Sequence, residues 1–275
     1  QKYYICYINY HFMAHSYDIA FVGSGNLATH LAKNLQKSGH RIVGVSSRRL
    51  ERAEQLAAHL SRDTAAVENP LSLPEAEIYI LAIADDALES LWETWQPPTP
   101  QTIVLHTSGS VSINSLRNLS TRYGVLYPLQ TFSVDRPLDF SEIPCFVEGS
   151  SEEITQRLLE LAKSVSNQVR ILDSERRKTL HLAAVFACNF VNHLYDVASS
   201  LLETKNLSPL WLLPLINETA KKVADLSPHD AQTGPARRGD RRVMEAHLTQ
   251  LESHSEWKKL YEVLSDSIFH QFHHD

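Results

Sequence analysis

Residues 23–28 (GSGNLA) form a G-x-G-x-x-A turn, a pattern that binds the pyrophosphate of dinucleotides. The turn follows a short apolar run and precedes an amphipathic segment, which is the strand-then-helix context that the pattern requires. There, Gly23 permits a tight turn, Gly25 lets the backbone approach the pyrophosphate, and Ala28 allows close packing of helix on strand. A glycine turn that binds nothing is the alternative, but the context favours a dinucleotide site. We expect it to be lined by Gly23, Ser24, Gly25, Asn26 and Leu27.

The residues after the second predicted strand indicate which dinucleotide binds. Sites for NAD usually carry an acidic residue about 20 positions after the glycine turn, where it binds the ribose 2′-hydroxyl. Here the sequence reads Ser46-Ser47-Arg48-Arg49, and these hydroxyls and guanidiniums can hold a phosphate that a carboxylate would repel. The arginines could instead be solvated at a helix start, but the helix dipole makes cations mildly unfavourable there. The sequence therefore predicts NADP(H), with Ser46, Ser47 and Arg48 at the site.

Two further strand ends carry candidate residues, at the edge of an open sheet where ligands bind. His106 ends an apolar run. It is a candidate proton donor to a carbonyl or imine, because histidine changes charge near neutral pH, or else a histidine that is hydrogen-bonded within the strand end. We interpret Asp85 or Asp86, after the preceding strand, as a helix N-cap rather than as catalytic. The candidate cofactor contacts at these two strand ends are Ala84, Thr107 and Ser108.

One long helix is predicted from Glu175 to about Lys205, and polar residues lie along one of its faces. Polar groups within an otherwise apolar helix need partners or a ligand. These residues either face a ligand or form a polar seam at a dimer interface. The residues at spacings of three and four on this face are His181, Val185, Cys188, Asn189, Asn192 and Asp196.

A turn between two predicted helices carries the last candidate. Residues 233–240 read TGPARRGD, in which two glycines and a proline fix the turn and Asp240 is placed to cap the next helix. That structural role does not explain the adjacent arginines. We predict that Arg238 holds a substrate carboxylate or phosphate through its planar guanidinium, with a solvated surface arginine as the alternative.

The elements that position these residues change character along the chain. Apolar runs alternate with amphipathic segments up to about residue 173, which predicts a doubly wound, mostly parallel α/β sheet of the Rossmann type. From Glu175 onward there is almost no strand pattern, which predicts an all-α domain. We expect a Rossmann-like domain at 18–173 and a helical substrate and dimerisation domain at 174–275. Residues 1–17, with five tyrosines, are expected to be an extension outside the fold, because Met13 lies where a natural start would fall.

Composition excludes several classes of function. The net charge of −6 argues against a surface built for nucleic acid or an anionic membrane, and no apolar run reaches the length of a transmembrane helix. Cys6, Cys145 and Cys188 are odd in number and lack metal-ligand spacing. They fit reduced thiols of a cytoplasmic protein better than a disulfide framework or a zinc site, and we predict no metal.

Five segments together resemble one family of bacterial proteins. This family has a Rossmann-like domain and a C-terminal helical domain of unknown function, and its members are often described as NADP oxidoreductases without an assigned reaction. It is more distantly similar to pyrroline-5-carboxylate reductase, to deazaflavin-dependent NADP reductases and to the 3-hydroxyisobutyrate dehydrogenase group. The resemblance covers about Asp18 to Glu252, and Tyr127 departs from it, since a histidine is expected there. The segments are 23–28, 46–49, 106–110 (HTSGS), 127–132 (YPLQTF) and 233–240.

This resemblance implies an NADPH-dependent reductase of a small carbonyl or imine substrate, or the reverse oxidation, or one acting on a deazaflavin-type partner. In the related dehydrogenases the long helix lines the active site, which makes His181 and Asn189 candidate catalytic residues here. We expect the helical domain to shape the substrate pocket and to form a homodimer. The alternative is a catalytically silent NADP(H)-binding sensor or scaffold, because the fold alone does not fix function.

Overall fold

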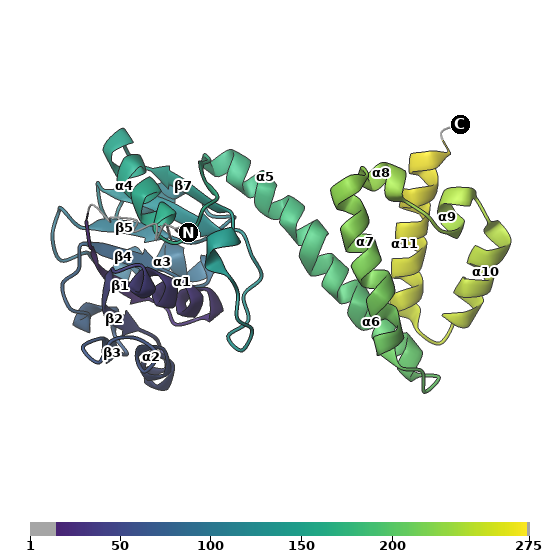
Figure 1. Ribbon diagram of the computed structural model, residues 1–275, viewed down its shortest axis with the longest axis horizontal. Helices are drawn as coiled ribbons and strands as arrows, with labels where there is room; N and C mark the ends of the chain where they lie inside the picture. The colour runs from purple at the N-terminus through teal and green to yellow at the C-terminus, as the bar shows by residue number, and fades with distance from the viewer. Residues whose placement is uncertain (1–14, 274–275) are drawn as a thin grey trace, which may run out of the picture. The chain divides into compact units, whose positions relative to one another are not determined.

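A computed structural model describes residues 15–273, apart from the side chains at 89, 90, 92 and 93. The chain divides into two compact units, Gln1–Cys188 and Asn189–Asp275, which we call the Rossmann unit and the helical unit. Figure 1 shows strands and helices in the first unit and helices in the second. The predicted fold class, a Rossmann-type α/β sheet followed by an all-α region, is confirmed. The predicted boundary between residues 173 and 174 stays a prediction.

One eight-stranded sheet, in the order β3-β2-β1-β4-β5-β6-β7-β8, forms the centre of the described part of the Rossmann unit. Neighbouring strands are parallel except β6 and β7, which are antiparallel. The three-residue strand β3 was not identified from the sequence, because so short a segment shows no periodicity. The strands are β1 (Asp18–Val22), β2 (Arg41–Ser46), β3 (Ala65–Val67), β4 (Ile78–Leu81), β5 (Ile103–His106), β6 (Tyr123–Pro128), β7 (Cys145–Gly149) and β8 (Val169–Ile171).

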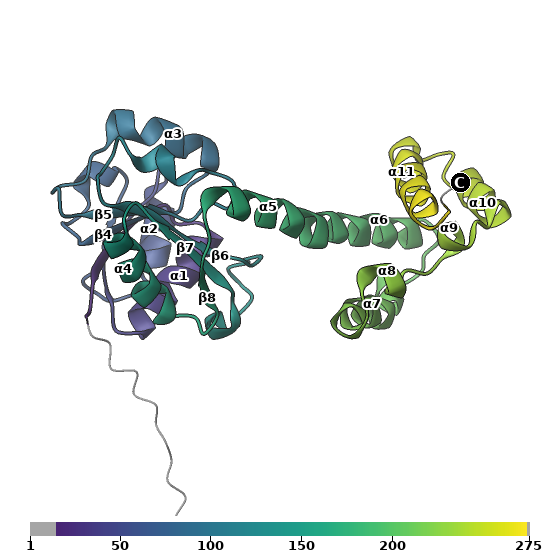
Figure 2. The same ribbon diagram turned by 90° about the horizontal axis from the view of Figure 1, so that it is seen from above.

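Helices cover both faces of this sheet. Figure 2 shows α3 on the face opposite to α1 and α4. The buried side chains divide in the same way, since Leu31 and Leu161 belong to one cluster and Leu88 to the other. The helices are α1 (Asn26–Lys37), α2 (Leu50–Ala57), α3 (Asp85–Thr94) and α4 (Glu152–Lys163), with short 3₁₀ turns η1 (Pro70–Ser72), η2 (Ile113–Leu116) and η3 (Phe140–Glu142).

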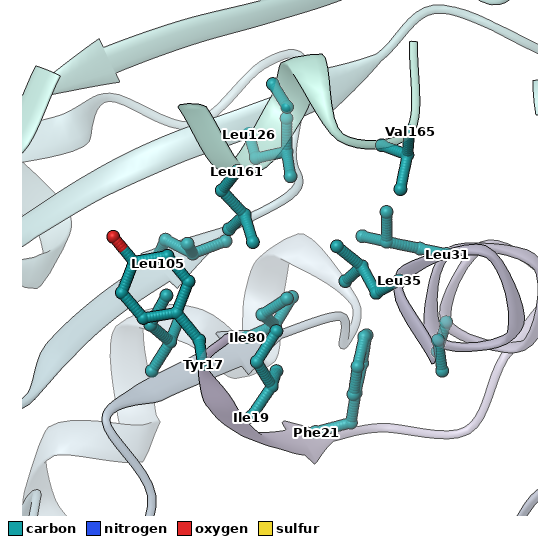
Figure 3. Close-up of a cluster of buried hydrophobic side chains, with 14 of the residues drawn as sticks. Tyr17, Ile19, Phe21, Leu31, Leu35, Ile80, Leu105, Leu126, Leu161 and Val165 are labelled. Atoms are coloured by element: carbon teal, nitrogen blue, oxygen red, sulfur yellow. The ribbon is translucent and has the colours of Figure 1, made fainter. Parts of the chain in front are cut away.

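The packed chain begins before Asp18, which corrects one expectation. Residues 1–14 of the predicted extension lie outside the described residues, but Tyr17 is only 4% exposed and belongs to the larger core cluster. Figure 3 shows its ring among Ile19, Leu105 and their neighbours. The Tyr17 carbonyl also accepts a hydrogen bond from the Arg41 amide. Tyr17 therefore adds a ring to the core, and the sequence missed it because one aromatic residue in a tyrosine-rich stretch shows no pattern.

The predicted long helix consists of three consecutive segments. These are α5 (Ser174–Ala184), the π-helical η4 (Val185–Phe190) and α6 (Val191–Glu203), and the division between the two units falls inside η4. The later segments are η5 (Pro209–Leu212), α7 (Leu213–Asp225), α8 (Pro228–Ala231), α9 (Pro235–Arg238), α10 (Arg241–Gln250) and α11 (Ser255–Phe272). As predicted, the Asp240 side chain caps α10 by accepting from the Val243 amide. Within residues 15–273, no helix is both long and apolar enough to span a membrane.

Candidate cofactor and substrate site

The candidate residues of the Rossmann unit meet at one edge of the sheet. The parallel strands β2, β1, β4, β5 and β6 are neighbours in that order, so their carboxyl ends form a row. Along it follow Ser46, the glycine turn, Ala84, His106 and Tyr127. Ligands of open α/β sheets bind outside such ends. Seven of the predicted cofactor contacts line one cavity of about 480 Å³ there, namely Gly23, Ser24, Gly25, Ser46, Ser47, Arg48 and Ala84.

The two glycines of the turn differ in what surrounds them. Gly23 has a φ of +109°, and a Cβ there would lie 2.2 Å from the Ala82 carbonyl oxygen, so only glycine fits between β1 and β4. A Cβ at Gly25 would meet no protein atom within 4 Å. Gly25 is the N-cap of α1 and offers no side chain to the first amides of that helix. The start of α1 therefore leaves free N–H groups beside open space, which is what a phosphate group needs.

Three arginines gather where β2 ends. Arg48 and Arg52 line the 480 Å³ cavity, and Ser47, Arg48, Arg49 and Arg52 line an adjacent hollow of about 450 Å³. Within residues 15–273, no ion pair or hydrogen bond is recorded for their guanidinium groups. Glu68 also lines the larger cavity, but it is exposed, so solvent screens its charge. The arrangement is a cationic patch beside the glycine turn, and Arg52 is the member that the sequence analysis missed.

The other two residues of the predicted turn, Asn26 and Leu27, do not line the cavity. The Asn26 side-chain amide donates to the Phe132 carbonyl over 2.8 Å. One turn further along α1, His30 donates through Nε2 to the Ser133 carbonyl over 2.9 Å. These bonds attach the first turn of α1 to the segment after β6. Asn26 therefore positions the N-terminal end of α1.

The loop between β4 and α3 is joined to the loop after β5. The N-cap of α3 is Ala84, which corrects our assignment of Asp85 or Asp86 as the cap. Asp85 lies in the first helical turn, and its carboxylate instead accepts from the Ser110 hydroxyl. Ser108 Oγ in turn accepts from the Ser110 amide. The loop that carries Thr107 and Ser108 is thereby fixed against α3.

His106 is completely buried at the end of β5. Its Nδ1 accepts from the Ser108 amide over 3.1 Å. Burial, and then the nearby Arg177 charge, lower the pKa of His106 to about 4. The ring is therefore neutral at neutral pH and shielded from solvent, which makes it a poor proton donor. This geometry favours the other interpretation, a histidine hydrogen-bonded within the strand end.

A histidine and a tyrosine meet beside that loop. The phenolic oxygen of Tyr127 lies 3.0 Å from Nδ1 of His181, which α5 supplies. Tyr127 is 7% exposed and burial raises its pKa, while the Arg177 charge acts in the opposite direction. The His181 ring lies against Gly109, where a Cβ would come within 2.6 Å of Nδ1. Tyr127, which we noted only as a departure from the family pattern, is thus in direct contact with a predicted catalytic residue.

A buried ion pair holds the first turn of α5 against the sheet. Arg177 is 1% exposed and donates to Glu148 of β7 over 2.5 Å and to the Val111 carbonyl over 2.5 Å. Ser174 donates to the same carboxylate over 2.8 Å and accepts from the Ile113 amide. These bonds fix the first turn of α5, and with it the direction in which His181 leaves the helix.

Two predicted catalytic residues belong to the helical unit. Asn189 is exposed, and so is Arg238. Arg237, the neighbour of Arg238, has a structural role, because it donates to the Gln232 carbonyl over 2.5 Å and lies over the Phe272 ring. The roles of Asn189 and Arg238 stay predictions.

Two family models match the chain in sequence. Residues 18–109 match a family described as NADP oxidoreductase, coenzyme F420-dependent. Residues 143–268 match a domain of unknown function. No curated protein matches the chain.

Solved structures extend this comparison. A Bacteroides fragilis protein, provisionally described as an NADP oxidoreductase, is 45% identical, with a TM-score of 0.87 over 92% of this chain and 98% of that one. An Aspergillus terreus reductive aminase in complex with NADPH and ethyl levulinate is 16% identical, with a TM-score of 0.66 over 92% and 93%. Plasmodium falciparum pyrroline carboxylate reductase with NADP bound is 11% identical, with a TM-score of 0.58 over 93% and 97%. The last two show a shared fold.

Proposed function

Because this chain belongs to the same family as the Bacteroides fragilis protein described provisionally as an NADP oxidoreductase, we propose that it reduces a small carbonyl or imine substrate with NADPH, or catalyses the reverse oxidation. The family resemblance drawn from the sequence motifs is confirmed. NADP(H), the predicted cofactor, is the one in the description of the matched family, so that prediction is confirmed at the level of the family. The substrate class is our proposal, and so is each residue's role.

The observation that carries the proposal is the pairing of an open glycine turn with a cationic patch. Open space at Gly25 and the free amides of α1 fit a pyrophosphate. Arg48 and Arg52, without recorded partners within residues 15–273, fit the additional 2′-phosphate that distinguishes NADP from NAD. A structural role would not require unpaired arginines beside an open cavity. The residues present therefore fit NADP(H).

The order of the strands gives the cofactor a direction. If the 2′-phosphate binds at the end of β2 and the pyrophosphate at β1, the nicotinamide end would extend toward β4, β5 and β6. Ala84, the 107–109 loop and Tyr127 would then lie on the side of the reacting end. The bound cofactor would supply the hydride. The protein's part is to hold substrate beside it and to give or take a proton.

We also propose that the helical unit forms a homodimer. Among its described residues, the buried side chains are only Ala236, Leu251 and Ser265. Large apolar side chains remain exposed, among them Trp211 at 69% and Leu215 at 63%. A unit that hides so little apolar surface needs a partner, and exposed apolar patches of this kind mark interfaces. A second copy of this chain is the simplest occupant, since it presents the same face. Separately, we propose that the protein is located in the cytoplasm.

The decisive experiment is a screen for NADPH consumption with keto acids, cyclic imines and a deazaflavin, measured by loss of NADPH absorbance. Turnover with one substrate class, and a clear preference for NADPH over NADH, would support the oxidoreductase. Tight NADPH binding with no consumption across the panel would favour the alternative, a silent NADP(H)-binding sensor or scaffold. Failure to bind NADPH at all would refute both.

A further inference from the structure

The contact between Tyr127 and His181 fixes where the protons of both side chains lie. The phenol is almost fully buried, and His181 Nδ1 is the partner recorded for its oxygen within residues 15–273. If the hydroxyl accepted from Nδ1 instead, its own O–H would be left buried without a partner, so we infer that the phenolic O–H donates to Nδ1. The neutral imidazole then carries its own proton on Nε2. Tyr127 thus selects one of the two tautomers of His181.

Gly109 determines which edge of the ring remains available. Its backbone lies so close to Cβ, Cγ and Nδ1 of His181 that an added Cβ would be within 2.9 Å of all three. The backbone of Gly109 has no positive φ, so the glycine is explained by space alone. The Nδ1 edge is therefore enclosed by Tyr127 and Gly109. The Nε2 edge of this half-buried ring is the one left for another partner.

We propose that Tyr127 and His181 form the proton-delivery pair of this site, an inference that rests on the proposed function. His181 gives its Nε2 proton to the substrate oxygen or nitrogen, while Nδ1 takes the phenolic proton of Tyr127. The hydride of the proposed reaction supplies both electrons, so the substrate gains one hydride and one proton. The ring stays neutral throughout, and the tyrosinate regains its proton from solvent through the half-exposed ring.

The surroundings of the pair suit this transfer. Arg177, held by Glu148 on β7, is the charged group that faces Tyr127, and it favours the phenolate form against the effect of burial. Phe146 of β7 lies on another side of the phenol ring, at 6.4 Å between centroids. Phe146 holds the phenol ring in place, and the fixed cation offsets part of the effect of burial, which is the larger one and keeps the pKa of Tyr127 raised.

The tautomer can be measured without any substrate. In protein labelled with ¹⁵N-histidine, the signals of His181 are those missing from His181→Gln, and its two nitrogen shifts are read at alkaline pH. We expect the Nε2–H tautomer in the wild type and a mixture of tautomers in Tyr127→Phe, which removes only the hydroxyl. An unchanged tautomer in Tyr127→Phe, or an Nδ1–H tautomer in the wild type, would overturn the inference.

A second measurement separates this inference from the proposed function. NADPH should still raise the melting temperature of Tyr127→Phe and of His181→Gln, because neither side chain lines the cavity proposed for the phosphates. If NADPH does not raise the melting temperature of the wild type, the proposed function is contradicted, but the tautomer result is unaffected. With a substrate from the screen, His181→Gln should lower kcat by about 10²-fold or more. Tyr127→Phe should change how kcat depends on pH, because the phenolic proton can no longer move to Nδ1 as Nε2 gives up its own. A profile identical to the wild type would contradict the pair.

Discussion

The imidazole of His181 lies directly over Gly109, so close that a Cβ on this glycine would come within 2.6 Å of Nδ1. Gly109→Ala should therefore push the ring away from Tyr127 without straining the backbone. We expect it to cost about 1–3 kcal/mol of stability, as overpacking usually does, and to reduce turnover as strongly as His181→Gln. NADPH should still raise the melting temperature, because Gly109 does not line the cavity proposed for the phosphates. Full turnover in Gly109→Ala would show that the position of His181 does not matter.

The two glycines of the cofactor turn should respond in opposite ways. Gly25→Ala adds a methyl group that meets no protein atom, so the melting temperature without ligand should be unchanged while NADPH stabilisation falls sharply. Gly23→Ala is the matched control, because it combines a positive φ with a 2.2 Å approach to the Ala82 carbonyl and should lower stability even without NADPH. Thermal melts of both variants with and without NADPH make the comparison. If Gly25→Ala binds NADPH as well as the wild type, the pyrophosphate lies elsewhere.

Arg48 and Arg52 should determine the preference for NADPH over NADH. A charge-assisted contact to phosphate contributes about 1.5–3 kcal/mol, so each alanine variant should lose roughly 10-fold or more in NADPH affinity. NADH affinity should be nearly unchanged. Arg62→Ala, an exposed arginine outside the cavity, serves as the control. Titration calorimetry with both nucleotides checks the prediction, which is contradicted if the two affinities fall together.

The sequence predicted the parts of this site that depend on local pattern. The G-x-G-x-x-A turn and the arginines after β2 each occupy a few consecutive residues, and their strand and helix contexts can be read from apolar periodicity. Arg52 was missed because the prediction stopped at the usual position after β2, whereas Arg52 lies in the first turn of α2, beyond the bend that carries Arg48.

Contacts between distant segments could not be predicted in this way. Tyr127 and His181 are 54 residues apart, and nothing in either segment shows that β6 and the last turn of α5 meet. The buried pair of Arg177 and Glu148, which fixes that meeting, resembles ordinary surface charges in the sequence. His106 had the residue type of a proton donor, but its type could not reveal that it is fully buried. Burial and tertiary contact, rather than residue type, decide those roles.

Two buried histidines should make the protein less stable in mild acid. Burial lowers the pKa of His106 to about 4, with a further contribution from Arg177, and lowers the pKa of His40 to about 4, with one from His15. An unfolded histidine has a pKa near 6.5, so below this pH the unfolded chain binds protons that the folded chain does not. Stability is therefore full above about pH 6.5 and is lost as the pH falls toward 4, by roughly 2 kcal/mol per histidine at about pH 5. Urea unfolding at about pH 6.5 and about pH 5 gives the free energy of unfolding at each pH. The loss between the two should be smaller in His106→Gln than in the exposed His59→Gln. Equal differences would contradict the burial argument.

A single charge on the apolar face of the helical unit should separate the proposed dimer. Leu215 on α7 and Leu71 in the Rossmann unit are each 63% exposed, so a glutamate at either position costs little within one chain. If a second copy covers α7, Leu215→Glu buries a charge in an apolar interface, which is strongly unfavourable. We expect sedimentation velocity to show a dimer for the wild type and for Leu71→Glu, and a monomer of lower melting temperature for Leu215→Glu. The Rossmann unit should still bind NADPH in the monomer, because the cofactor cavity lies wholly within that unit. A wild type that sediments as a monomer would refute the proposed dimer, and a Leu215→Glu variant that remains dimeric would place its interface away from α7.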